Sequence, residues 1–452
     1  MTRTPRRPSR VGIARSRGEA LRRGAQPPSA PWSHRTCTGG SSLLTTCLLA
    51  LTLSACTSGQ DSAAPPTCTT RFTEDSREAD ARSFVTDLPS VEGTIRVQAR
   101  LPDTDGDTDA AWPVAVVIHG AWDAAGTPVA EGSATVAVAQ GRVAVHFDLP
   151  GNGSATVGTD DRRGARARGV VQAVLRWAAN EREDVDGCTL SARLPAARGP
   201  LVLVGASNGG NLALTTLADP ALELPPLAGV LTWETPAAPG FVTVQWGRRD
   251  ALYTPHTCTR DAESVVTCDL PVELLAVSPA GEPCFDRTGD GCTDDDVRLQ
   301  GVLDPVSRKR MLAPELLAAL DARGIRTRGF ASADRARAWW TERDASQAAA
   351  AAVRNHPALA FLIVASASDH VLPYPDHPHV HALGESLQAA GAAWVRLNPG
   401  RAWLRDARGE NTPDLLFSLA TGEGRLLTED EEQPLEEALA SGVDELATRS
   451  VQ

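Results

Sequence analysis

Several residue types are scarce in this sequence of 452 residues. Lys309 is the only lysine, and methionine and tyrosine occur twice each. The formal net charge is −12 at pH 7, and no basic patch follows the N-terminal segment. An acidic surface does not attract a phosphate backbone, which argues against nucleic acid as a partner. The hydrophobic fraction of 42% is nevertheless enough for a sizeable core, which excludes disorder throughout the chain.

The sequence also lacks a comfortable membrane span. The apolar run SSLLTTCLLALTLSAC at 41–56 is short, follows an arginine-rich segment and ends in small residues, which is the layout of a secretory signal peptide. Its end, LSAC, resembles the bacterial lipobox, in which the cysteine becomes lipidated. The resemblance implies a lipid anchor on Cys56 and a location in the cell envelope, at the outer membrane or on the periplasmic face. An ordinary signal peptide or a buried apolar segment is the alternative.

Common zinc-binding patterns are missing as well, since neither a CxxC pair nor an HExxH motif occurs. Nine cysteines are present, and removal of the signal and the lipid site leaves six. An even number of cysteines in an exported protein suggests disulfides. Short separations favour two pairs and leave a third by default: Cys258–Cys268, Cys284–Cys292 and Cys68–Cys188.

The mature chain divides into a tether and one domain. Residues 57–80 begin with small, polar and proline residues, which predicts a flexible tether. Residues 81–452 form the predicted domain, and between about 240 and 345 its regular pattern breaks. We interpret that stretch as an insertion, or cap, over the strand ends. The acidic, helix-prone tail beyond 405 is interpreted as a solvated surface helix.

Apolar runs of about four to eight residues recur along the domain, and most of them lead into glycine, aspartate or serine. With their flanking residues they are PVAVVIHG, RVAVHFDLPG, PLVLVGAS, LAGVLTW and FLIVASASD. Continuous apolar strands, buried on both faces, are typical of a parallel sheet. Helix-like stretches such as 169–181 and 211–219 alternate with them. This alternation predicts an α/β fold with a doubly wound, mostly parallel sheet.

Candidate reacting groups follow these strands, because open α/β sheets collect them at the carboxyl ends. The segment LVLVGASNGGNLALTTLA at 201–218 places Ser207 in a G-x-S-x-G turn between a buried run and a helix. Asn208 begins that helix, so its backbone N–H can stabilise an oxyanion. Upstream, IHGAW and DLPGNGS end two other runs. A turn serine on an inert scaffold is the alternative for Ser207.

Together these motifs resemble the α/β-hydrolase family over most of residues 90–400. The resemblance implies a nucleophile elbow at Ser207 and a second oxyanion donor at the backbone N–H of Ala121. His119, just before it, is expected to orient the loop. Asp369, after the FLIVASASD run, stands where the family carries its acid. A strand-capping aspartate is the alternative reading of Asp369.

The family pattern fails at the histidine. A triad histidine normally follows the last strand, but no histidine follows His381. His377 and His379, expected in a loop before a helix, are candidates for a relocated base, with His379 slightly favoured. One alternative is that no triad forms. The other is a weak metal site built from Asp376, His377, His379 and His381.

A second possible site lies at 284–296, CFDRTGDGCTDDD. The segment resembles a calcium loop, with Asp286 first and Asp290 fifth, and it departs from that pattern at the third and twelfth positions. Asp286, Asp290 and Asp294 are the candidate ligands for a structural calcium. An acidic turn closed by a disulfide is the alternative, and no organic cofactor is implied.

These features predict an exported, lipid-anchored serine hydrolase that acts on a small-molecule ester, or less readily an amide. Esters are favoured because the sequence shows no β-propeller or other gating domain. The membrane is reached through the lipid anchor only. The rival is a catalytically inactive surface lipoprotein that keeps the fold and binds through the 240–345 insertion. Its support is the missing terminal histidine.

Overall fold

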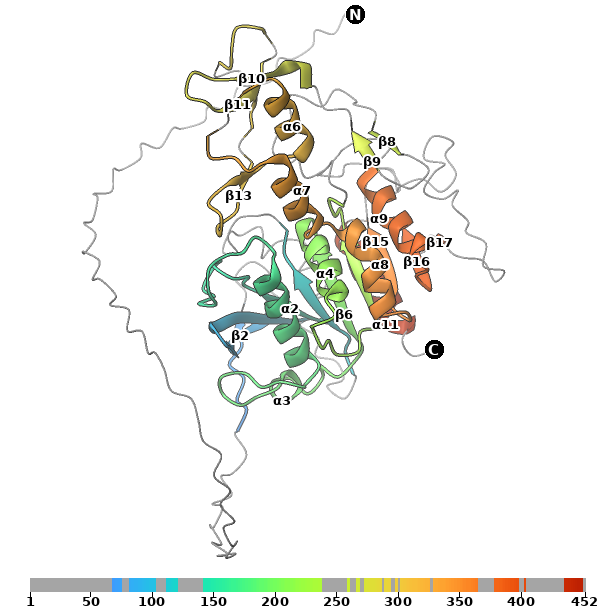
Figure 1. Cartoon of the computed structure of the whole chain (residues 1–452). Helices are drawn as coiled ribbons and strands as arrows, with labels where there is room; N and C mark the ends of the chain where they lie inside the picture. Colours follow the sequence, from blue (N-terminus) through green and yellow to red (C-terminus); the bar gives the residue numbers. More distant parts are fainter. Residues whose placement is uncertain are drawn as a thin grey trace, which may run out of the picture. The chain divides into compact units, whose positions relative to one another are not determined.

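Figure 1 shows a computed structural model of the whole chain. The structure describes residues 67–74, 81–102, 111–120, 141–237, 258–260, 266–268, 272–286, 288–293, 297–299, 301–325, 328–364, 378–397, 402–403 and 435–449. The predicted signal peptide, Cys56 and part of the tether lie outside these ranges. None of the helices within them has the length and apolar character needed to cross a membrane.

A ten-stranded sheet forms the centre of the domain, in the order β1-β2-β3-β5-β4-β6-β7-β15-β16-β17. The strands are β1 (Thr73–Glu74), β2 (Ala81–Ser90), β3 (Gly93–Pro102), β4 (Val114–Ile118), β5 (Val143–Phe147), β6 (Leu201–Ala206), β7 (Gly229–Trp233), β15 (Ala360–Val364), β16 (Trp394–Leu397) and β17 (Ala402–Trp403). The six strands from β5 to β16 in this order run parallel, and the edges are antiparallel. The predicted doubly wound, mostly parallel sheet is confirmed.

The strand order reverses beside β4, because the chain moves from β4 to β5 on one side and to β6 on the other. In open α/β sheets such a switch point opens a crevice at the carboxyl ends of the strands, where ligands bind. The residues that follow β4 and β6 are therefore expected to line a ligand-binding or active site.

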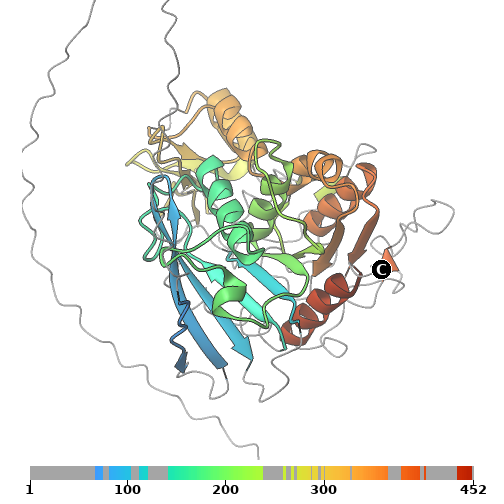
Figure 2. The same cartoon turned by 90° about the horizontal axis from the view of Figure 1, so that it is seen from below.

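Helices cover both faces of the sheet. On one face, α2 (Ala165–Ala178), α4 (Asn208–Ala218), α8 (Ala345–Asn355) and α9 (Pro378–Ala389) pack in the larger apolar cluster. On the other face, α11 (Leu435–Arg449) packs in a smaller cluster, and Figure 2 shows it across the sheet from α2 and α4. Both alternate sets of side chains of each central strand are buried, which explains the unbroken apolar runs.

The prediction of a solvated tail helix is wrong for α11. Leu439, Val443 and Leu446 are fully buried, and their spacing of four and three residues forms one apolar stripe on a helix. The acidic residues that suggested a solvated helix lie beside this stripe. Asp444 pairs with Arg142, and Glu445 pairs with Arg396. Both arginines precede the helix by many residues.

The predicted disulfide-bearing insertion is present. It contains α6 (Pro314–Ala322), α7 (Ala333–Thr341) and short antiparallel strands. Those strands and one 3-10 turn are β8 (Cys258–Arg260), β9 (Val266–Cys268), η1 (Val272–Leu274), β10 (Leu275–Val277), β11 (Pro283–Phe285), β12 (Val297–Arg298), β13 (Val302–Leu303) and β14 (Arg310–Met311). Met311, Leu320 and Trp340 are buried in a cluster of the insertion's own.

Two of the three predicted disulfides are confirmed. Cys68 bonds to Cys188 and so ties the tether to the domain, and Cys284 bonds to Cys292 within the insertion. Cys258 and Cys268 are directly opposite residues in the β8–β9 ladder. Their disulfide stays a prediction.

Candidate active site

Ser207 occupies the turn between β6 and α4, with φ 50° and ψ −123°. A positive φ is costly for a residue with a side chain, and such strained positions gather at functional sites. The surrounding structure holds this one in place. The Ser207 N–H donates to the carbonyl oxygen of Trp233 at 2.7 Å, and the Gly210 N–H donates to the Ser207 carbonyl at 2.9 Å. The strained strand-to-helix turn expected from G-x-S-x-G is therefore present.

The glycines around Ser207 are required by close backbone contacts. A Cβ on Gly205 would lie 2.5 Å from the Cα of Gly210, and one on Gly209 would lie 2.3 Å from the carbonyl oxygen of Ile118. Neither position has room for a side chain, because both neighbours are backbone atoms. The G-x-S-x-G spacing thus lets α4 begin directly against the ends of β4 and β6.

The turn that follows β4 lies against Ser207. A Cβ on Gly120 would be 2.9 Å from the Cβ of Ser207 and 3.6 Å from its Oγ. The His119-Gly120 turn and the elbow therefore meet at the switch point of the sheet. Ala121, the predicted second oxyanion donor, comes next in the chain but lies outside the described residues.

His119 is bound to its own turn. Its Nδ1 lies 2.8 Å from the carbonyl oxygen of Gly120, and since a carbonyl only accepts, Nδ1 carries the hydrogen. Burial, together with the nearby Arg163 guanidinium, lowers the pKa of His119 to about 3. The imidazole is therefore neutral at physiological pH. Its contact fits the expected loop-orienting role.

Arg163 holds the same turn from the other side and was not found by sequence analysis. Its Nη2 donates to the carbonyl oxygens of His119 and Gly120, at 2.9 Å each. Arg163 is only 5% exposed, and its backbone is left-handed, with φ 64°. Burial lowers its pKa to about 10, so the guanidinium stays protonated at neutral pH. In the sequence it is hidden in the charged run DDRRGARAR, which resembles a solvated surface.

Asn208 is the first residue of α4 and is 3% exposed. The N-terminus of a helix carries unpaired N–H groups and a partial positive charge, and here it begins beside Ser207. Asn211 fixes this end of the helix. Its Nδ2 donates to the Pro236 carbonyl at 2.8 Å, and its Oδ1 accepts from the Ala345 N–H at 2.9 Å. These bonds connect α4 with the segment after β7 and with the start of α8.

An acidic residue that sequence analysis did not identify lies beside β6, the strand that leads into Ser207. Glu234 directly follows β7, the neighbour of β6, and is 4% exposed with φ 43°. Its backbone N–H donates to the Val364 carbonyl at 2.9 Å. The short sequence WET after an apolar run gave only a weak signal for a buried carboxylate at this strand end.

The predicted acid and base lie mainly in undescribed parts of the chain. Asp369 and His377 fall outside the described residues, and so does Asp376. His379 is described, and its predicted loop position is wrong. It lies in the first turn of α9 and is fully buried. Pro378 suits the first position of a helix because its φ is already helical, so the helix begins before His379.

The calcium loop is described in part. Asp286 accepts the N–H groups of Gly289 at 2.7 Å and Gly291 at 2.8 Å, one on each carboxylate oxygen. The Thr288 hydroxyl donates to Asp290 at 2.7 Å. Among the described residues, no three His, Cys, Asp or Glu side chains group closely enough to hold a metal ion. Asp294 is outside the described residues, so calcium binding stays a prediction.

Known proteins resemble this chain in structure only. No family model matches the sequence, and no curated protein matches it either. Carboxyl esterase 2 of the fungus Tuber melanosporum is 12% identical, with 74% of this chain and 81% of that chain covered and a TM-score of 0.39. Brefeldin A esterase, a bacterial homologue of human hormone-sensitive lipase, is 16% identical, with 85% and 81% covered and a TM-score of 0.42. A putative carboxylesterase from Lactobacillus plantarum is 13% identical, with 70% and 88% covered and a TM-score of 0.37.

Identities and TM-scores this low carry no argument about activity. The assignment of an α/β-hydrolase fold follows from this chain's own strand order and from the elbow at Ser207.

Proposed function

We propose that the protein is an exported, lipid-anchored serine hydrolase that cleaves an ester bond by acyl transfer. The observation that carries the proposal is the backbone of Ser207, which stays in a strained conformation at the switch point of the sheet, with the His119-Gly120 turn against it. At a turn without a function, glycine would avoid the conformational cost that serine carries here.

In the proposed reaction, the Ser207 Oγ attacks the carbonyl carbon of the ester and a base takes its proton. The backbone N–H groups of Asn208 and Ala121 donate to the oxyanion of the tetrahedral intermediate. The base then returns the proton to the leaving alcohol, and an acyl-serine remains. A water molecule, deprotonated by the same base, releases the acid and restores Ser207.

His379 and His377 are the proposed bases, and Asp369 is the proposed carboxylate partner. Glu234 is a second candidate for the carboxylate, because it is buried at the end of the strand next to that of Ser207. A buried carboxylate at a strand end can orient an imidazole and stabilise its positive form.

Export through the Cys56 lipobox is proposed from the sequence. The disulfides Cys68–Cys188 and Cys284–Cys292 support it, since disulfides persist in oxidising compartments. The alternative remains a non-catalytic surface lipoprotein that binds through the insertion.

The test is labelling of the purified full-length protein with a fluorophosphonate, which forms a covalent bond with an activated serine. We expect labelling of the wild-type protein and none of Ser207→Ala. His377→Ala and His379→Ala, labelled in parallel, would locate the base. A folded wild-type protein that takes up no label would overturn the enzyme and favour the binding lipoprotein.

A further inference from the structure

The His119-Gly120 turn is held by a buried cation that comes from a different part of the chain. Arg163 precedes α2, yet its Nη2 donates to both carbonyl oxygens of the turn. The Gly120 oxygen lies within hydrogen-bond distance of two donors, this nitrogen and the Nδ1 of His119. Both lone pairs of the carbonyl are therefore used.

A restraint on the Gly120 carbonyl acts on the next residue as well. The peptide group is planar, so its C=O and the N–H of the following residue turn as one unit. The N–H joined to the Gly120 carbonyl belongs to Ala121, which is the second oxyanion donor in the proposed function. We propose that Arg163 is a positioning residue that acts by holding the Gly120 carbonyl, and with it the peptide group that supplies the second oxyanion donor of the proposed function.

The charge of Arg163 adds to the effect of its position. A hydrogen bond from a cation is stronger than one between neutral groups, and a carbonyl polarised in this way makes the N–H of its peptide a better donor. Both effects are larger in a buried place than in water, because the local dielectric constant is lower. A neutral side chain of the same length would provide neither the stronger hydrogen bond nor the polarisation of the peptide.

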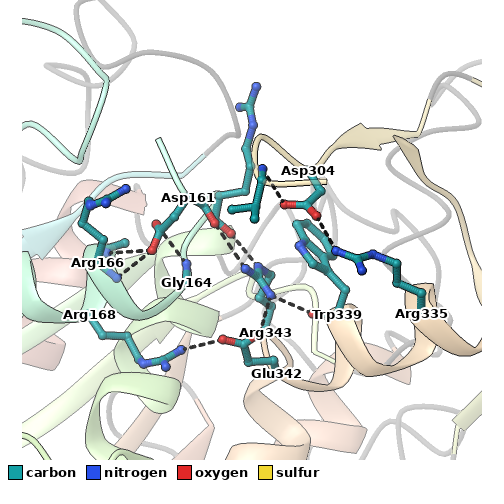
Figure 3. A network of polar contacts seen from close by, with 12 residues as sticks. Asp161, Gly164, Arg166, Arg168, Asp304, Arg335, Trp339, Glu342 and Arg343 are labelled. Atoms are coloured by element: carbon teal, nitrogen blue, oxygen red, sulfur yellow. Dashed lines mark hydrogen bonds and ion pairs between the residues drawn. The ribbon is translucent and has the colours of Figure 1, made fainter. Parts of the chain in front are cut away.

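The loop that carries Arg163 is held by the insertion, and Figure 3 shows Arg343 bonded to Asp161 of this loop. Arg343, after α7, donates from Nε to the Arg162 carbonyl at 2.7 Å and from Nη2 to the Asp161 carbonyl at 3.2 Å. Its guanidinium also lies over the Trp339 ring, 4.0 Å from the centroid. The loop that carries Arg163 is thus held to a packed helix and does not have to be ordered during the reaction.

The test compares Arg163→Met with a matched control, Arg162→Met. Both residues have a left-handed backbone in the same loop, and both variants lose one positive charge. The Arg162 side chain pairs with Asp160 at 3.1 Å. The measurements are the kcat and KM for 4-nitrophenyl butyrate, the rate of fluorophosphonate labelling and the melting temperature, all on the purified full-length protein.

For Arg163→Met we expect kcat to fall about 10- to 100-fold with KM within about twofold of the wild-type value, because an oxyanion donor acts mainly in the transition state. Labelling should slow in parallel. Arg163→Lys, which keeps the charge, should recover part of the rate, and Arg162→Met should keep the wild-type kcat.

Because the proposal rests on the proposed function, the experiment separates their failures. A wild-type protein that is not labelled overturns the function itself. Where the wild type is labelled, an Arg163→Met variant with wild-type kcat, or with a loss no larger than that of Arg162→Met, overturns the role of Arg163 alone. If Arg163→Met does not fold, Arg163→Lys decides: a reduced kcat at unchanged KM supports the role, and an unchanged kcat overturns it.

Discussion

At the scale of the residue, the backbone of Ser207 combines local strain with a proposed function. A non-glycine residue in a sparsely populated backbone region costs about 1–3 kcal/mol, and glycine avoids most of this cost. Glycine also loses about 0.5–1 kcal/mol more conformational entropy on folding than alanine does. We therefore expect Ser207→Gly to unfold in urea with a free energy about 1 kcal/mol higher than Ser207→Ala, while neither variant takes up fluorophosphonate. Equal stability of the two variants would show that the elbow is not strained.

The carboxylate of the proposed triad is also a question about single residues. Replacing such a carboxylate by its amide leaves the shape unchanged but lowers kcat about 10⁴-fold, because the histidine loses its orientation and its stabilised charge. We expect this loss in Asp369→Asn and a change below about threefold in Glu234→Gln, with hydrolysis of 4-nitrophenyl butyrate as the measurement. The reverse result would assign the triad carboxylate to Glu234, after β7, instead of Asp369, after β15.

At the scale of the element, α7 is attached to the loop before α2 through Arg343. The Arg343 side chain is 8% exposed, and its hydrogen bonds reach the carbonyls of Asp161, Arg162 and Trp339. Hydrogen bonds from a charged group contribute about 1.5–3 kcal/mol, and the substitution takes this donor away from all three carbonyls. Arg343→Met should therefore lower the free energy of unfolding by about 2–3 kcal/mol.

The control for this prediction is Arg337→Met on α7, the helix that Arg343 follows. Arg337 is 58% exposed and forms a surface pair with Glu315. Exposed pairs of this kind contribute about 0–1 kcal/mol, so the control should change the stability little. A similar loss in both variants, measured by urea unfolding, would mean that helix α7 responds to any loss of charge.

Across the whole molecule, the features that could be predicted are those that the local sequence of a single segment determines. The apolar runs gave β4, β5, β6, β7 and β15, because a strand buried on both faces must be apolar throughout. The elbow was predictable for a similar reason, since its glycines have no room for a side chain. Short separation in sequence gave the Cys284–Cys292 pair.

What could not be predicted depends on partners that are distant in sequence. Arg163 resembled a solvated residue because its acceptors come about forty residues earlier. Asp444 and Glu445 gave α11 an acidic composition, while their arginine partners lie on other elements and the helix buries its apolar stripe. The position of His379 required knowing that α9 begins at Pro378. In each case the local pattern was ambiguous, and tertiary contacts decided the outcome.

The stability of the molecule should fall in mild acid, because two partly buried histidines are neutral in the folded chain. Burial lowers the pKa of His119 to about 3 and that of His146 to about 4, with Arg163 and Arg100 as the neighbouring cations. Between these values and the ordinary pKa of about 6.5, the unfolded chain binds protons that the folded chain does not. Their contribution to stability is therefore fully present above pH 6.5 and is lost as the pH falls. From pH 7 to pH 5 the loss is roughly 2 kcal/mol for each histidine.

Urea unfolding at pH 7 and pH 5 tests this prediction in the wild-type protein and in His146→Gln. The Nε2 of His146 lies 2.8 Å from the Oε1 of Gln98, and a glutamine amide can donate to the same oxygen. The variant should lose about 2 kcal/mol less stability between the two pH values than the wild type does, whatever its stability at pH 7. An equal loss in both proteins would assign the acid sensitivity to other groups, because a glutamine cannot take up the proton that His146 binds in the unfolded chain.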